Sequence, residues 1–348
     1  MNKRLAQALV LWICLLGLRA WAQDQGRSPA TLPKVRIAAD GRTLETADGK
    51  PFVPFGVNYY RPGTGWAPQL WKQFDADATR QDFARMKELG VNCVRVFLTY
   101  GSFFMDRDQL LAEGLAKFDQ FLSMAEEAGI YVHPTGPDHW EGMPHWRPRD
   151  LAGDEDSLSA LETFWKLFAS RYRGRNAIFA YDLRNEPAVP WETAEMRGRW
   201  NAWLQKHYGS ADELAKAWAA SQDAIRWGEQ PPPSPKDASD SLPLLDYQRF
   251  REELADQWTR RQIAAIKSAD PAALVTVGLI QWSVPALLPG VQQYSGFRPQ
   301  RQAPLLDFLE IHFYPLAAGF YHYAAEDEVR NLAYLESVVR ETAACGKP

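Results

Sequence analysis

Acidic, amide, imidazole and aromatic side chains recur at or near the ends of apolar segments in this sequence. They are Asn58-Tyr59-Tyr60, Arg95, His133, Asp138-His139-Trp140-Glu141, Arg184-Asn185-Glu186-Pro187, and Glu310 with His312 and Tyr314. A carboxyl group held at a strand end can serve as a general acid or base. Amides, imidazoles and flat rings nearby can hold a hydroxylated substrate. The repeated placement predicts one polar site assembled from several strands.

Glu186 is the strongest candidate for a catalytic group. It follows an apolar run, Pro187 fixes the turn after it, and Trp191 lies close behind. Asn185 can hold a substrate hydroxyl through a hydrogen bond that strengthens in the transition state. The competing interpretation, a helix N-cap or a surface acid, explains the carboxylate but not the buried strand in front of it. We therefore predict that Glu186 is a general acid/base.

Strand-like and helix-like patterns alternate along the chain and predict an α/β fold. The strand-like runs are 52–57, 91–98, 130–132, 178–183, 274–279 and 306–313. Nearly continuous apolar strands separated by amphipathic helices predict a parallel sheet covered by helices. This pattern leaves both a doubly wound sheet and a (β/α) barrel open. No glycine-rich phosphate fingerprint follows the first strand, and the polar residues gather at carboxyl ends, which favours the barrel.

The chain divides into three predicted parts. Residues 1–22 have the basic, apolar and small-residue regions of a signal peptide, with a retained anchor as the alternative. Residues 23–33 form a polar tether. Residues 34–348 form the barrel domain, which begins with a hairpin at 35–49 and carries a helical, Trp- and Pro-rich insertion at 190–245. We expect a secreted or periplasmic protein with no membrane association after signal cleavage.

Composition restricts the function further. The formal net charge is −4 and no basic stripe is present, which argues against nucleic-acid binding. The 14 Trp, 13 Tyr and 17 Phe residues can supply both a core and a sugar-binding cleft. Trp165 and Trp258, within helical patterns, are expected in the core. A second set lies on predicted loops and is expected to stack on sugars: Trp140, Trp146, Trp191 and Trp282. Cys93 is expected to be a buried free thiol.

Three segments together resemble the clan A retaining glycoside hydrolases. They are Asn92-Cys93-Val94-Arg95-Val96, Asp182-Leu183-Arg184-Asn185-Glu186-Pro187 and Ile311-His312-Phe313-Tyr314-Pro315. The likeness runs from about Val35 to Pro348 and is greatest to family 5, with its endo-β-mannanase-like and cellulase-like members. It implies a TIM barrel in which Glu186 is the acid/base and Arg95, Asn185, His312 and Tyr314 contact or orient the reacting groups. It also implies sugar contacts for His139 and Trp140.

The resemblance also implies a nucleophile that the sequence does not contain. A retaining mechanism needs a second carboxylate about 5–5.5 Å from the first, which this clan places on the seventh barrel strand. The sequence shows six of eight strands, so we expect an incomplete (β/α)8 barrel, truncated before the seventh strand, with the nucleophile beyond Pro348. The alternative nucleophile is Glu310, which shares an inward face with His312. Its other interpretation is an ion-pair partner of Arg95 or Arg184.

The predicted function is hydrolysis of a β-linked polysaccharide or oligosaccharide, most like that of a β-mannanase. Part of the insertion, from Trp203 to Trp218, resembles β-galactosidases of the same clan, and a cellulase-like activity also remains open. No cofactor or metal is expected, because His133, His139, His145 and Asp138 lack the spacing of a metal site. The alternative class is a carbohydrate-binding barrel without catalysis.

Overall fold

The computed structural model describes residues 32–104, 106–138, 144–146, 154–235, 241–284, 291–314 and 325–348. The predicted signal peptide and most of the tether, as well as His139 and Trp140, lie outside these ranges. Among the described helices, none combines the length and the apolar character that a membrane crossing requires.

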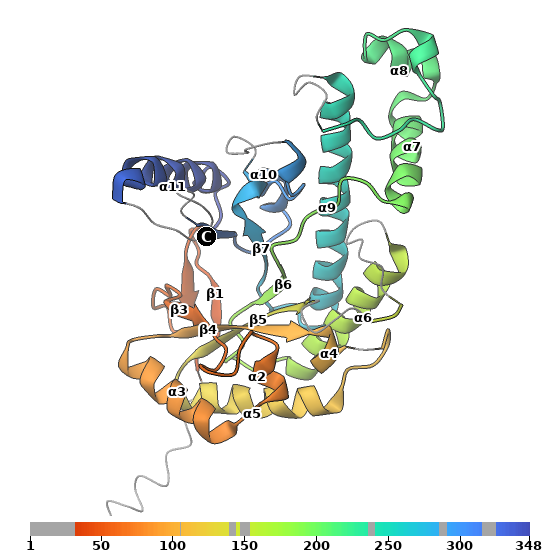
Figure 1. Cartoon of the computed structure of the whole chain (residues 1–348). Helices are drawn as coiled ribbons and strands as arrows, with labels where there is room; N and C mark the ends of the chain where they lie inside the picture. Colours follow the sequence, from red (N-terminus) through yellow and green to blue (C-terminus); the bar gives the residue numbers. More distant parts are fainter. Residues whose placement is uncertain are drawn as a thin grey trace, which may run out of the picture.

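Six parallel strands form one curled sheet, an incomplete TIM barrel, as the sequence predicts (Figure 1). They run in chain order, each paired with the next: β3 Gly56–Asn58, β4 Cys93–Thr99, β5 Tyr131–Asp138, β6 Tyr181–Asn185, β7 Val275–Ile280 and β8 Glu310–His312. The helices α3 Ala76–Glu88, α5 Ala112–Ala128, α6 Glu155–Tyr172, α9 Leu242–Ala269 and α11 Glu328–Ala343 connect or follow the strands. A separate antiparallel hairpin joins β1 Val35–Ile37 to β2 Leu44–Thr46.

Local sequence signals explain where the helices begin and end. The Asp75 side chain accepts a hydrogen bond from the Ala78 amide at the start of α3, and Asp154 caps α6 in the same way. Gly129 ends α5 in the left-handed conformation, with φ of 75°. Leu89, after the last turn of α3, is 66% exposed although it follows the apolar stripe of that helix.

The strands differ from the prediction mainly in where they begin and end. The first strand is shorter than predicted, because Phe55 donates its amide to the Asn92 side chain instead of to a neighbouring strand. At Gly56 the backbone lies so close to β4 that an added Cβ would be 2.2 Å from the Cys93 carbonyl oxygen. The third strand is longer than predicted and carries His133, Thr135 and Asp138 within β5. The site residues of β5 are therefore strand residues, held by the sheet.

Aromatic rings fill the layer between the sheet and its helices. Trp165 and Trp258 are buried there, as predicted, and Trp165 contacts Tyr181 of β6 with ring centroids 5.7 Å apart. Cys93 is a buried free thiol, also as predicted. The extension formed by α7 Ala194–Tyr208 and α8 Ala211–Ala217 has its own aromatic cluster, in which Trp200 stacks on Trp203 and Trp218. These insertion rings pack on one another and on α9.

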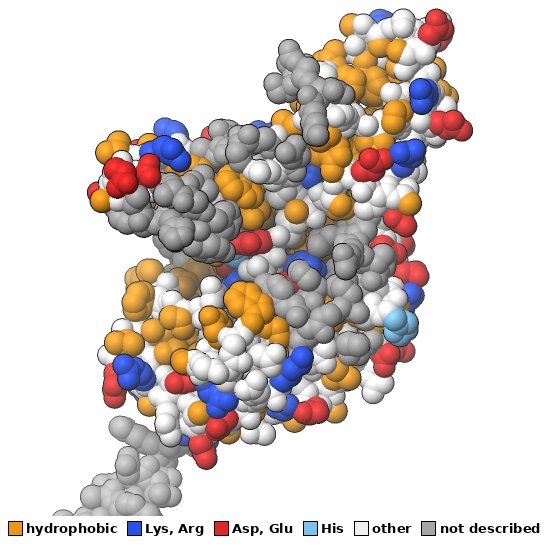
Figure 2. Space-filling model, in the orientation of Figure 1, with side chains coloured by type: hydrophobic (Ala, Val, Ile, Leu, Met, Phe, Trp, Pro, Cys, Tyr) orange, Lys and Arg blue, Asp and Glu red, His pale blue; other side chains and the backbone are white. Residues whose placement is uncertain are grey.

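Large hydrophobic side chains are exposed near the first strand of the sheet and on the last described helix. Near β3, Val53 and Phe55 are 73% and 61% exposed, and hydrophobic side chains gather over β3 in the space-filling view (Figure 2). On α11 the exposed large hydrophobic residues are Val329, Leu332, Leu335 and Val339. Beside β8, the Leu309 amide donates to the Pro348 carbonyl over 2.8 Å. The same kind of bond starts the pairing of β6 with β7, where Tyr181 donates to the Leu274 carbonyl.

Candidate active site

A pocket of about 580 Å³ opens at the carboxyl ends of the strands, where ligands bind in parallel α/β folds. Its volume is in the usual range for small-molecule sites, about 300–1,000 Å³. Five of the predicted site residues line it together: Arg95, Asn185, Glu186, His312 and Tyr314. The other two predicted contacts, His139 and Trp140, lie outside the described residues.

Glu186 is held in an unusual backbone conformation at the end of β6. Its φ is 48°, in the left-handed region that residues with a Cβ disfavour by about 1–2 kcal/mol. Its amide donates to the Gly278 carbonyl of β7 over 2.9 Å, which fixes the turn against the sheet. The turn brings its carboxylate to the ring of His312, where Oε1 lies 2.8 Å from Nδ1. The backbone bond and the contact with His312 together fix the orientation of the Glu186 carboxyl group at the pocket wall.

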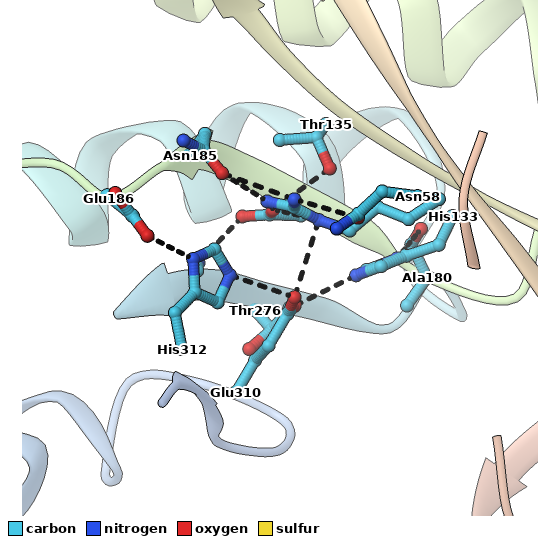
Figure 3. A network of polar contacts seen from close by, with 12 residues as sticks. Asn58, His133, Thr135, Ala180, Asn185, Glu186, Thr276, Glu310 and His312 are labelled. Carbon is cyan, nitrogen blue, oxygen red and sulfur yellow. Dashed lines mark hydrogen bonds and ion pairs between the residues drawn. The ribbon is translucent and has the colours of Figure 1, made fainter. Parts of the chain in front are cut away.

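His312 lies between two carboxylates. On its other side, Nε2 is 3.4 Å from Oε1 of Glu310 (Figure 3). Burial alone would lower the pKa of His312, but the hydrogen bonds to Glu186 and Glu310 raise it to about 9. At neutral pH, which is below this pKa, the ring is an imidazolium, and each ring nitrogen donates to the carboxyl oxygen that faces it.

Glu310 is held by groups from two other strands. Arg95 Nε of β4 lies 3.4 Å from Oε1, and His133 Nε2 of β5 lies 3.0 Å from Oε2. Burial would raise the pKa of Glu310, but Arg95 and His133 hold that pKa well below its usual range. Glu310 is thus an ion-pair partner of Arg95, one of the two pairings that the sequence left open.

Asp182 anchors the floor of the site. It is fully buried; its Oδ2 accepts from Arg95 at 2.5 Å and from Thr135 at 2.9 Å, while Oδ1 accepts from the Gly278 amide. Burial raises the pKa of Asp182, and the charge of Arg95 opposes that shift. Arg95 also donates to the side-chain oxygens of Asn58 and Asn185. Together with its contact to Glu310, the Arg95 guanidinium thus binds groups from β3, β6 and β8.

His133, Asp182 and Glu310 place their ligand-type atoms within 4.8 Å of one another. Arg95 already contacts both carboxylates of this cluster. A metal ion would have to bind beside that guanidinium, so the donor set does not fit a metal. His145, at the described edge of the neighbouring loop, is exposed.

The aromatic wall of the pocket differs from the prediction. Tyr60, Trp66 and Phe97 line the pocket, and Trp66 is 54% exposed. Sequence reasoning missed Trp66 and Phe97 as pocket residues. Their positions could have indicated this role, because Trp66 follows the first predicted strand and Phe97 lies near the end of the second.

Of the four tryptophans expected to stack on sugars, Trp140 lies outside the described residues, and the other three are not among the residues that line this pocket. Trp146 packs edge-on against Phe104, with ring centroids 5.5 Å apart, and Trp191 packs against Tyr247 at 5.2 Å. Trp282, in the short 3₁₀ turn after β7, is not among the described residues that line the pocket. Ring type and a loop position were not enough to separate packing rings from pocket rings.

A curled parallel sheet with an Asn-Glu pair at the end of its fourth strand and a His-x-Tyr on its sixth defines a clan A glycoside hydrolase barrel. A family model described as beta-galactosidase, glycoside hydrolase family 42, matches residues 158–348. That is more than half of the chain, and the protein belongs to this family. The more specific expectation of family 5 is not confirmed.

Solved structures of a β-galactosidase and of a mannosidase resemble this chain. A catalytic mutant of a family 42 β-galactosidase from G. stearothermophilus aligns with a TM-score of 0.62 and 16% identity, covering 81% of this chain and 43% of that one. An exo-β-1,4-mannosidase from Opitutaceae bacterium strain TAV5 aligns with a TM-score of 0.54 and 18% identity, covering 89% and 53%. These likenesses show the fold.

Curated relatives match over shorter stretches. The mannan endo-1,4-beta-mannosidase F of Aspergillus clavatus is 26% identical over 190 residues, 47% of this chain and 44% of that protein. A beta-xylosidase of Phanerodontia chrysosporium is 29% identical over 147 residues, 38% and 29% respectively. The chain thus aligns with less than half of the length of these relatives.

Proposed function

We propose that the protein is a retaining β-glycoside hydrolase in which Glu186 is the general acid/base. The observation that carries this proposal is the Glu186 carboxylate, fixed at the pocket wall beside Asn185 and hydrogen-bonded to the His312 imidazolium at 2.8 Å. In the first step Glu186 gives its proton to the leaving glycosidic oxygen. In the second step it takes a proton from the water that releases the sugar from the enzyme.

Negative charge develops on Glu186 as its proton leaves, and the neighbouring imidazolium stabilises that charge. Asn185 is placed to bind a sugar hydroxyl, and its side-chain oxygen is already oriented by Arg95 at 3.1 Å. A preorganised donor set of this kind acts where charge develops and costs no reorganisation during the reaction.

The nucleophile in this proposal is a Glu beyond Pro348, on a strand that pairs with β8. The bond from the Leu309 amide to the Pro348 carbonyl supports this position, because equivalent bonds start the pairing of neighbouring strands in the sheet. Glu310 fits the role less well. Arg95 and His133 bind its two oxygens, and the ring of His312 lies between it and Glu186.

The substrate that we favour is a β-galactoside, because the family model that covers 158–348 describes beta-galactosidases. A β-linked mannan or manno-oligosaccharide is the second candidate, favoured by the two mannosidases among the curated relatives. We also propose that residues 1–22 direct the protein to the periplasm or to secretion. Cell fractionation with and without these residues tests that part.

Glu186→Gln in the full-length protein tests the assignment. The variant keeps the shape of the side chain and removes its acid, so kcat on 4-nitrophenyl β-galactoside or unactivated β-1,4-oligosaccharides is expected to fall about 10²–10⁴-fold with an unchanged melting temperature. Glu252→Gln is the matched control, since Glu252 is a buried glutamate on α9 that accepts from Tyr294.

Full turnover of an unactivated oligosaccharide by the Glu186→Gln variant would refute the assignment. The wild-type protein decides between the proposed enzyme and a non-catalytic sugar-binding barrel. If the wild-type protein binds these sugars with micromolar affinity and does not hydrolyse them, the proposed enzyme is refuted and the sugar-binding barrel is supported.

A further inference from the structure

We propose that Glu310 is a positioning residue of this site, which fixes the orientation and the positive charge of the His312 ring so that Nδ1–H points at Glu186. This inference rests on the proposed role of Glu186 as acid/base. It adds a residue that does not contact Glu186 and acts on it through the imidazole.

The geometry of Glu310 suits this role because each of its oxygens is bound from a different direction. Oε1 receives Arg95 Nε and His312 Nε2, and Oε2 faces His133 Nε2 (Figure 3). His133 is itself fixed, since its Nδ1 lies 2.8 Å from the Ala180 carbonyl and must donate to it. Strands β4 and β5 therefore hold the carboxylate in place, and β8 carries both Glu310 and His312.

The alternation of β8 and a glycine on β7 make room for the imidazole. Glu310 and His312 are two residues apart, so their side chains leave the strand on the same face. Gly278 of β7 lies opposite Glu310 in the pairing of the two strands. A Cβ added at Gly278 would lie 2.9 Å from His312 Nε2 and 3.0 Å from Arg95 Nη2, closer than ordinary contacts allow. The ring is thus confined between Gly278, Glu310 and Glu186.

The charges around His312 require a second acceptor to keep the ring protonated. Within the described residues, the charged groups that face the ring are Glu186 after β6, Glu310 on β8 and Arg95 on β4. Arg95 and burial both disfavour the imidazolium. Glu186 alternates between carboxylate and acid during the reaction, so of these groups only Glu310 offers a permanent negative charge to the ring.

The carboxylate–imidazole pair has a known physical precedent. A buried carboxylate that accepts from one ring nitrogen selects the tautomer and the orientation in which the other nitrogen acts. Here Glu310 accepts from Nε2–H, which leaves Nδ1–H directed at Glu186 Oε1. Loss of the Glu310 charge would weaken the imidazolium that stabilises Glu186 after it has released its proton.

Glu310→Gln tests the proposal, with Glu252→Gln as the matched buried control. Nitrogen-15 NMR of the purified chain follows the protonation of His312, assigned through its absence in His312→Gln. We expect the Glu310→Gln substitution to lower the titration midpoint of His312 by at least about one pH unit. In the full-length enzyme we expect a kcat about tenfold or more lower, with KM changed less than about twofold. The alkaline limb of the kcat profile should shift by a similar amount.

An unchanged His312 midpoint in Glu310→Gln would overturn the inference, as would a kcat loss with an unshifted pH profile. If Glu310→Gln does not fold, Glu310→Asp retains the charge and is expected to keep the midpoint within about half a pH unit of the wild type. If the His312 midpoint in Glu310→Asp falls to about 6.5, the value of an unperturbed histidine, the inference is overturned. The NMR result does not need turnover, so a protein without glycosidase activity refutes the proposed function and leaves this measurement decisive.

Discussion

The charge on His312 makes the stability of the protein depend on pH above neutrality. The pKa of His312 rises from 6.5 to about 9 in the folded protein, because Glu186 and Glu310 bind the imidazolium against the cost of burial. A raised pKa contributes stability that is fully present below pH 6.5 and is lost as the pH rises through about 9. A tenfold change in a proton-binding constant corresponds to about 1.36 kcal/mol, so the protonated ring contributes about 3 kcal/mol to the free energy of unfolding.

Urea denaturation at a series of pH values measures this contribution, with His312→Gln as the reference. The wild type contains the titrating ring and the variant does not, while all other groups are shared. Between pH 6 and 10 we expect the free energy of unfolding of the wild type to fall by about 3 kcal/mol more than that of the variant.

Parallel stability curves for the two proteins would refute the reasoning. They would mean that the pKa of His312 is the same in the folded and the unfolded protein, and that the contacts at 2.8 and 3.4 Å do not stabilise an imidazolium. A wild type that becomes relatively more stable with rising pH would contradict even the sign of the change in pKa.

Three further substitutions test other parts of the site. Gly278→Ala places a Cβ 2.9 Å from His312, so we expect it to cost about 1–3 kcal/mol of stability and to lower kcat at least tenfold, measured by urea denaturation and steady-state kinetics. Arg95→Met leaves buried Asp182 without its cation, and urea denaturation should show a loss of about 3–5 kcal/mol. Trp66→Ala removes an exposed ring, so stability should change by less than about 0.5 kcal/mol while KM rises for a tetrasaccharide and not for a nitrophenyl glycoside.

The sequence predicted the convergence of the site well because the parallel sheet imposes it. Carboxyl ends of neighbouring parallel strands meet at one face, so Arg95, Glu186 and His312 had to approach one another once the strands were identified. Period-two alternation also predicted that Glu310 faces inward beside His312, and its contact with Arg95 follows from that.

Other features depend on strand register and on packing, which the sequence pattern does not encode. Asp182 was recognised as part of a motif, but its contacts with Thr135 and the Gly278 amide exist only because β6 lies between β5 and β7 in this register. Trp191 was expected to stack on a sugar, and Trp66 was not singled out from the sequence. In the structure Trp191 packs against Tyr247, whereas Trp66 lies beside Tyr60 and is 54% exposed at the pocket.

The polar network explains how a rigid sheet can control a single carboxyl group. Acidic and basic groups alternate from Asp182 through Arg95 and Glu310 to His312 and finally Glu186. Each of the four inner members is bound by at least two groups and Glu186 is bound by His312, so we expect a change at the buried end to reach Glu186 through the charge of the imidazole. The aromatic residues that line the pocket, such as Trp66, lie outside this network. We therefore expect a substitution at Trp66 to leave the contact between His312 and Glu186, and the role that we propose for Glu186, unchanged.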